Sequence, residues 1–342
     1  LAQFLEYLES GERDPEEITF MEPQAGGACR AGNIYNLLQR VLYRMVEQGQ
    51  LEYAQIPVIS LNLMGEEKHT GFRITPSLLS GGIAAGCYGD LIMCLYQQVK
   101  PYEQNPGETD RIRSQVEKKL CESIRRHRNG RHTREKNYRY ACEVFSKVPV
   151  KPGKKKRVGI TGEIYMKYSK LGNDDIESFL LRQGMEPYSG GFVNYCLYLV
   201  DTERYKAEKY QHNPIMVKAC AFVLHRLCEA QKHLLTVIGE TDRFQTDLPF
   251  PELKEKVQGI LAEGCNTGDG WLIAAEVIQY VEKGCGSVLI LHPFGCLVSH
   301  VCERGILQRL HARFPDVSIL TIEYDYDQSK TLRESRILLA IS

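Results

Sequence analysis

The chain has 342 residues, more than one hydrophobic core commonly serves, so we expect two domains. Apolar residues make up 43% and charged residues 25%, and the formal net charge of zero excludes a general attraction to nucleic acid or membranes. No signal peptide is evident and no apolar run looks long enough to span a bilayer, which predicts a cytoplasmic protein without membrane contact.

The twelve cysteines lack the short, regular spacing of a disulfide framework. We therefore expect reduced thiols in a cytosolic, anaerobic setting. No C-x-x-C pair occurs, which argues against a ferredoxin, a thioredoxin or a zinc ribbon.

The first 150 residues predict an N-terminal α/β domain. The chain opens in an apparent helix at Leu1, which suggests a fragment of a longer polypeptide. A helix over 33–49 precedes a buried strand over 56–62, and an apolar helix is expected over 78–99 after Pro76. The stretch 108–147 predicts one long helix or a helical pair interrupted near 129–130.

A Lys- and Pro-containing linker at 151–157 leads into the predicted C-terminal α/β domain, 151–342. Strands are expected at 158–163, 287–291 and 317–323, with helices between them and after the last. This alternation predicts an α/β protein: two domains with parallel, Rossmann/flavodoxin-like sheets flanked by helices.

Three loops would follow strands of the C-terminal sheet, at 162–165, 292–296 and 324–327. Ligands of open parallel sheets bind beyond the carboxyl ends of the strands, so these loops should converge on one edge. Glu163 could act there as an acid/base or a cofactor neighbour, and the alternative is a helix cap or a surface carboxylate. Asp327 is expected to be the N-cap of the last helix.

Two cysteines stand in similar settings. Cys29 follows Gly27, Cys296 follows Gly295, and each precedes a helix-like stretch. Glycine permits close backbone approach, and a helix N-terminus favours a thiolate, so both sulfurs could bind one inorganic cofactor. The alternative is a pair of buried free cysteines. Cys265, in a Gly-rich loop, is a further candidate ligand.

Residues 111–139 carry eleven Lys/Arg and three Glu, a local net charge of +8. This pattern fits a solvated helix face, a nucleic-acid stripe, or a dock for an anionic partner or a nucleotide-bearing thioester. Tyr138 is the only aromatic residue of the segment, so we expect no nucleic-acid binding. The chain has no Walker A, G-x-G-x-x-G or G-x-S-x-G motif.

Several ordered motifs resemble one family over nearly the whole chain. The motifs are 27–33 (GACRAGN), 57–62 (PVISLN), 88–91 (YGDL), 101–103 (PYE), 162–165 (GEIY), 268–272 (GDGWL), 293–297 (PFGCL) and 324–325 (YD). They are similar to the C-terminal region of CoA-substrate-specific enzyme activase-related proteins, which belongs with the 2-hydroxyacyl-CoA dehydratase (2-hydroxyglutaryl-CoA dehydratase-like) superfamily. Val298-Ser299 departs from the family's usual proline-asparagine before His300.

The resemblance implies a [4Fe–4S] or related iron–sulfur cluster held by three cysteines where α/β domains meet. Cys29 and Cys296 match two of these ligands, and the third would lie upstream of Leu1, so the chain by itself could lack the cluster. Arg30 and Glu163 would neighbour the cluster.

The implied partner is an ATPase activator domain of actin-like fold on the same full-length chain, and the implied substrate is a CoA thioester. The expected function is an iron–sulfur redox protein, a dehydratase or reductase component that acts on CoA thioesters and receives electrons from the ATP-dependent activator. The alternative is a non-catalytic scaffold or electron-relay module of a multidomain activase.

Overall fold

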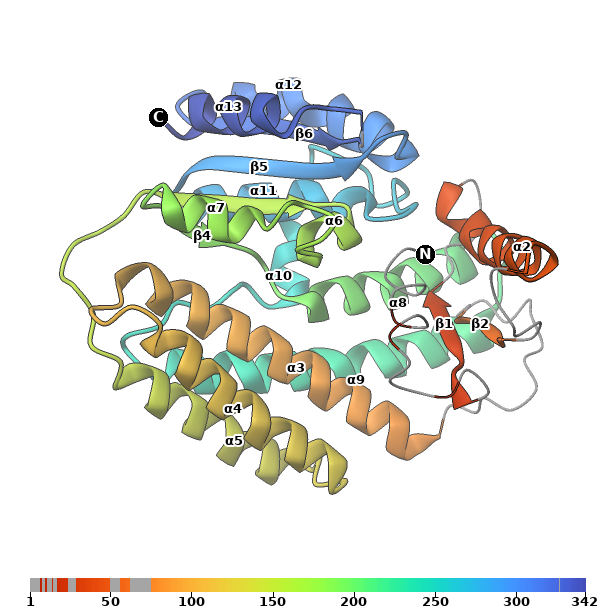
Figure 1. Ribbon diagram of the computed structural model, residues 1–342, viewed down its shortest axis with the longest axis horizontal. Helices are drawn as coiled ribbons and strands as arrows, with labels where there is room; N and C mark the ends of the chain where they lie inside the picture. Colours follow the sequence, from red (N-terminus) through yellow and green to blue (C-terminus); the bar gives the residue numbers. More distant parts are fainter. Residues whose placement is uncertain are drawn as a thin grey trace. The chain divides into compact units, whose positions relative to one another are not determined.

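The computed structural model describes residues 7, 10, 14, 17–23, 29–49, 56–61, 75–325 and 327–342 (Figure 1). The chain divides into two compact units, residues 1–74 and 75–342. The boundary predicted at residue 150 therefore lies inside the second unit. The reason is a shared core: residues of the helices before 150, such as Leu91 and Phe145, belong to the same buried cluster as Val288 of the sheet.

The first unit contains a parallel pair of strands, β1 (Phe20–Pro23) and β2 (Val58–Leu61), with Phe20 opposite Val58. The short helix η2 (Arg30–Asn33) leads into α2 (Ile34–Glu47), whose Leu42 packs with Val58. The helix and strand expected at 33–49 and 56–62 are thus confirmed.

The second unit is built on a four-stranded, all-parallel sheet of order β4-β3-β5-β6. Its strands are β3 (Arg157–Gly162), β4 (Glu186–Tyr188), β5 (Cys285–Pro293) and β6 (Ser318–Tyr324). The predicted α/β class and parallel sheet are confirmed for this unit. The chain adds β4 on one side of β3 and then β5 and β6 on the other, so the order reverses between β3 and β5. In sheets of this kind that switch point is where ligands bind.

Helices cover both faces of this sheet because alternate side chains of its strands point in opposite directions. Val288 and Ile290 of β5 share a core with α11 (Gly270–Glu282), whereas Leu289 and Leu291 share the other core. Three helices complete that second core: α6 (Ile164–Tyr168), α7 (Ile176–Arg182) and α13 (Lys330–Ile341). Every residue of α11 from Gly270 to Tyr280 is buried, as expected for a helix that is apolar on all sides.

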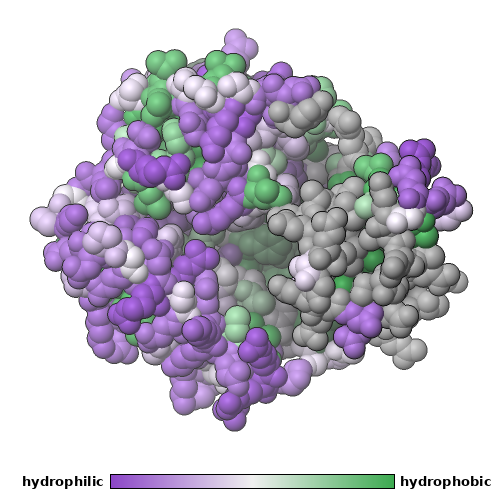
Figure 2. Space-filling view, viewed as in Figure 1, coloured by the Kyte–Doolittle hydropathy of each residue, from purple (hydrophilic) through white to green (hydrophobic). Residues whose placement is uncertain are grey.

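A layer of long helices lies along one side of the sheet (Figure 1). It consists of α3 (Pro76–Val99), η3 (Lys100–Tyr102), α4 (Glu108–Arg125), α5 (Arg131–Ser146), α8 (Phe192–Lys209), α9 (Pro214–Gly239) and α10 (Phe250–Glu255). The helical pair predicted over 108–147 is confirmed, with its break at 126–130. Figure 2 shows that the face formed by this pair is mostly hydrophilic.

The apolar helix α3 contradicts the expectation that no apolar run is long enough to span a bilayer. Pro76–Tyr102 is long and apolar enough to cross a membrane by length and composition alone. Thr75 caps it by accepting a hydrogen bond from Leu78 N at 3.1 Å, and Pro76 stands in its first turn, where its missing N–H is tolerated. Its residues Leu91 and Leu95 are fully buried among the neighbouring helices.

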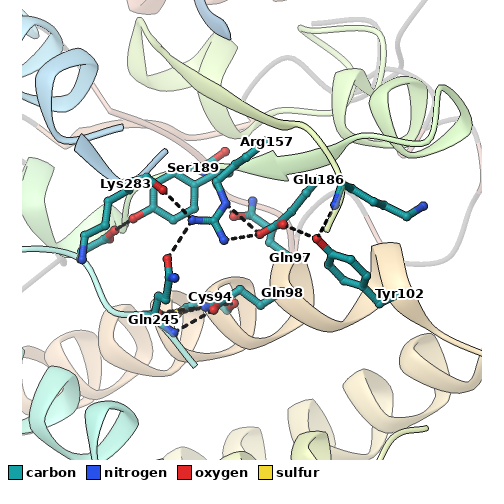
Figure 3. Close-up of polar contacts among 12 residues, drawn as sticks. Cys94, Gln97, Gln98, Tyr102, Arg157, Glu186, Ser189, Gln245 and Lys283 are labelled. Carbon is teal, nitrogen blue, oxygen red and sulfur yellow. Dashed lines mark hydrogen bonds and ion pairs between the residues drawn. The ribbon is translucent and has the colours of Figure 1, made fainter. Parts of the chain in front are cut away.

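A polar network joins the helical layer to the amino ends of β3 and β4 (Figure 3). Arg157 donates from Nε to Glu186 at 2.9 Å and from Nη1 to Lys283 O at 2.9 Å. Tyr102 Oη donates to the other Glu186 oxygen at 2.7 Å, and Gln97 Oε1 accepts from Ser189 N at 2.9 Å. These bonds cross the predicted linker and make the helices and the sheet one unit.

Candidate metal and thiol site at the carboxyl edge of the sheet

The three predicted loops do meet at one edge of the sheet. In the strand register Gly162 lies opposite Leu291, and Pro293 opposite Tyr324. The pairing continues into the loops, because Glu163 N donates to Leu291 O at 2.8 Å and Phe294 N to Tyr324 O at 2.9 Å. The convergence predicted from the parallel-sheet rule is therefore confirmed.

Glycine is required at the turn after β3. Gly162 has φ +130°, and a Cβ there would lie 2.0 Å from Leu291 O. Gly295, with φ +70°, makes the corresponding turn after β5 and delivers Cys296 to the edge. Both glycines let a loop fold back tightly over the strand ends.

Glu163 is a helix cap, which was the alternative to its predicted role as an acid/base or cofactor neighbour. Its carboxylate accepts a hydrogen bond from Met166 N at 3.0 Å and so caps α6. Burial raises the pKa of Glu163 above its usual value. Asp327, by contrast, is not the cap of the last helix: Ser329 occupies that position, so the prediction was wrong by two residues.

Cys296 is half-buried at this edge and is followed by the helical residues 298–303. Burial raises the pKa of its thiol, and hydrogen bonding by Ser299 offsets this only in part. Burial therefore favours the neutral thiol over the expected thiolate, because desolvation outweighs the hydrogen bonds from Ser299.

Two more half-buried cysteines belong to this region, Cys302 near Cys296 and Cys265 next to Cys302. Cys302 is in the π-helical segment η4 (Ser299–Glu303), and Cys265 precedes α11. Burial, together with the neighbouring Cys265 and Cys296 thiols, raises the pKa of Cys302 to about 11. No three of the described cysteines have sulfurs mutually within 4.8 Å. The edge thus holds neighbouring thiols without a preformed three-sulfur group.

Cys29 belongs to the first unit and is half-buried immediately before η2, so its predicted position ahead of a helical turn is confirmed. Gly27 and the side chain of Arg30 lie outside the described residues. Because Cys29 and Cys296 are in different units, their meeting at one cofactor stays a prediction.

A second group of potential ligands is present on the same edge. His292 Nδ1 lies 3.9 Å from Glu323 Oε2, and His300 Nε2 lies 3.5 Å from the same oxygen. The ligand atoms of these three residues all lie within 4.8 Å of one another. Among the His, Cys, Asp and Glu side chains in the described part of the chain, this is the group that could hold a metal ion. Burial lowers the pKa of His292, which favours the neutral imidazole that metals bind.

Glu303 is fully buried next to this group, and neither of its carboxylate oxygens has a hydrogen-bond partner. His292 Nε2 also lacks a partner and faces Glu303 Oε1 at 3.9 Å, beyond hydrogen-bond distance. Burial raises the pKa of Glu303 to about 8 against smaller opposing effects of the nearby Ser299 hydroxyl and of Arg304, so a protonated carboxyl group is favoured at neutral pH.

A third set of buried charges is fully paired. Glu276 of α11 accepts from Lys167 Nζ at 2.7 Å and from Thr161 Oγ1 at 2.5 Å. Asp269 lies close enough to Glu163 and Glu276 that, after burial, they raise its pKa further. Sequence reasoning missed Lys167 and Glu276, although one glutamate inside the apolar stretch 271–281 was a signal for a buried, partnered carboxylate.

Comparisons of this chain with protein-family models, with curated proteins and with solved structures find no match.

Proposed function

We propose that this chain is an iron–sulfur redox protein that resembles 2-hydroxyacyl-CoA dehydratase components and receives electrons from an ATP-dependent activator. One observation carries the proposal: Cys296 stands at the carboxyl edge of a parallel sheet, on a glycine turn, with the Cys302 thiol near it and Cys265 next to Cys302. Cysteine thiolates are the ligands that hold iron–sulfur clusters. A bound cluster would supply a low-potential electron.

The residues of the edge fit such a group in chemical type. Cys296 and, from the first unit, Cys29 are the proposed ligands, and the third is proposed upstream of Leu1 or at Cys265. Cys302 is a further thiol of the same set. The raised thiol pKa values of Cys296 and Cys302 mean that metal binding must displace protons, so loading should improve as pH rises.

The other parts of the proposal concern partners and location. All twelve cysteines are free, which is consistent with the reducing cytoplasm we propose. An open groove lined by Arg111, Lys118, Lys119 and Tyr140 lies on the basic segment and could receive the phosphates of a CoA thioester. The electron donor would be an activator domain of actin-like fold.

Anaerobic reconstitution with iron and sulfide tests the proposal. We expect the full-length protein to bind iron and sulfide in stoichiometric amounts and to give an EPR signal after reduction, and we expect Cys296→Ser and Cys29→Ser to abolish it. Stoichiometric loading of these 342 residues alone would assign the third ligand to Cys265. Cys121→Ser is the matched control, because Cys121 is exposed on α4. Loading equal to that of the control in both variants would refute the ligand assignment. A spectrum that CoA thioesters leave unchanged would favour the relay alternative over the enzyme.

A further inference from the structure

We propose that His292, His300 and Glu323 bind one divalent transition-metal ion, with zinc as the first candidate. This site uses nitrogen and oxygen donors and is separate from the thiol site proposed above. Two imidazoles and one carboxylate form a known ligand set for both Zn²⁺ and Fe²⁺.

The separation of the ligand atoms is close to what a metal needs. Tetrahedral zinc with bonds of about 2.1 Å places its ligand atoms about 3.4 Å apart. Glu323 Oε2 is 3.5 Å from His300 Nε2 and 3.9 Å from His292 Nδ1. All three ligand atoms lie within 4.8 Å of one another, so side-chain rotations would bring them toward this spacing.

The fold holds these ligands on rigid elements. His292 and Glu323 are register partners on the adjacent strands β5 and β6, so their side chains leave the sheet side by side. His300 comes from the π-helical segment η4, a helix form that is frequent at functional sites. Its ring packs edge-on against that of His292, with centroids 5.6 Å apart.

Glu303 provides an independent sign of a metal site. A metal on His292 Nδ1 would displace its contact with Pro293 O at 3.4 Å and put the proton on Nε2, which faces the buried Glu303 carboxyl group. Metal-binding histidines usually donate their second N–H to such a carboxylate. Two orphaned buried groups would thus acquire a partner in each other when the metal binds.

The site has an open side. His300 retains 36% of its side-chain exposure, whereas His292 has none. Three protein ligands and one open position would leave room for a water molecule, and zinc lowers the pKa of bound water to about 7. The chemistry on offer is therefore Lewis-acid activation of water or of a carbonyl group at the sheet edge.

Arg304 competes with the metal for Glu323. Its Nη2 lies 3.4 Å from Glu323 Oε2, so its positive charge interacts with the same carboxylate oxygen that the ion would bind. Removing that charge should strengthen metal binding, whereas removing a ligand should weaken it. A cluster with a merely structural role would not respond in opposite directions.

Titration of the full chain with Zn²⁺ alone, by calorimetry against a competing chelator, tests the proposal. We expect one ion per chain, and we expect His300→Ala and Glu323→Gln each to weaken binding by at least about 10- to 100-fold. Arg304→Gln should tighten it about two- to fivefold, a small effect because the arginine is half-exposed. His300 is partly exposed, so its variant should remain folded, which circular dichroism would verify.

Two controls separate this site from others. His225→Ala removes an exposed histidine of α9 and should leave the zinc affinity unchanged. Cys265→Ser with Cys302→Ser removes the nearby thiols and should also leave it unchanged. The proposal is overturned if no zinc binds, or if the ion survives His300→Ala and Glu323→Gln but is lost with the cysteines.

Discussion

Two of the glutamates that are buried in the second unit differ in their partners. Glu276 is held by Lys167 and Thr161, whereas Glu303 has no hydrogen-bond partner for either oxygen. A buried charge is tolerated where it is paired, and a buried carboxyl group without a partner instead keeps its proton. Glu276 therefore has a structural role, whereas the burial of Glu303 costs stability, as is often the case for functional groups.

The largest expected effect comes from breaking the paired site. Lys167→Met would leave the Glu276 carboxylate buried without its counter-ion, which typically costs about 3–5 kcal/mol of unfolding free energy. Urea denaturation would measure this, and the double variant Lys167→Met with Glu276→Gln should recover part of the loss. A change under about 1 kcal/mol in the single variant would show that solvent reaches Glu276.

The buried Glu303 carboxyl group predicts that the stability of the fold depends on pH. The folded-state pKa of Glu303 is about 8, above the ordinary carboxyl value of 4.5. Between these values the native state keeps a proton that the unfolded chain releases, so stability should fall by up to about 1.4 kcal/mol per pH unit as pH rises. Below pH 4.5 both states are protonated and the contribution is constant.

Glu303→Gln tests that slope. Glutamine at this position does not titrate. The stability of the variant should therefore fall less steeply than that of the wild type from pH 5 to pH 8 when a chelator is present. Glu255→Gln, at an exposed position on α10, is the matched control and should keep the wild-type slope. Identical slopes in all three proteins would mean that Glu303 ionises in the folded state as it does in the unfolded chain.

The smallest effects should come from exposed charges, which sharpen the contrast with the buried ones. Arg125, Arg126 and Arg128 are exposed, and Arg126 pairs with a half-exposed Glu122. Reversing each charge should change the unfolding free energy by less than about 0.5 kcal/mol. Unfolding of such a variant would instead assign these arginines a structural role.

The same variants address what the basic segment binds. Tyr138 is fully buried, so it offers no ring for stacking on a base. We expect no binding of duplex or single-stranded DNA at micromolar concentration in physiological salt. We expect the reversed charges to weaken binding of CoA or of the activator, measured by calorimetry. Tight DNA binding by the wild type would overturn this interpretation.

The sequence alone determined most of the local structure. Alternation of apolar strands and helices predicted the parallel sheet of the second unit, because those periodicities follow from backbone geometry. The sheet rule then located the loops that carry Glu163 and Cys296. Gly295 could be identified because a tight turn needs a residue that adopts positive φ.

Only the tertiary structure decided the grouping of distant residues. The two compact units meet at residue 74 and not at the predicted residue 150, because α3 to α5 bury their apolar faces in the same core as the sheet. The composition of a linker does not reveal such packing. His292 and Glu323 became neighbours through strand register, and Glu276 found Lys167 across a 109-residue separation. Long-range pairings depend on how the layers stack, whereas sequence patterns report only what each segment does with its nearest neighbours.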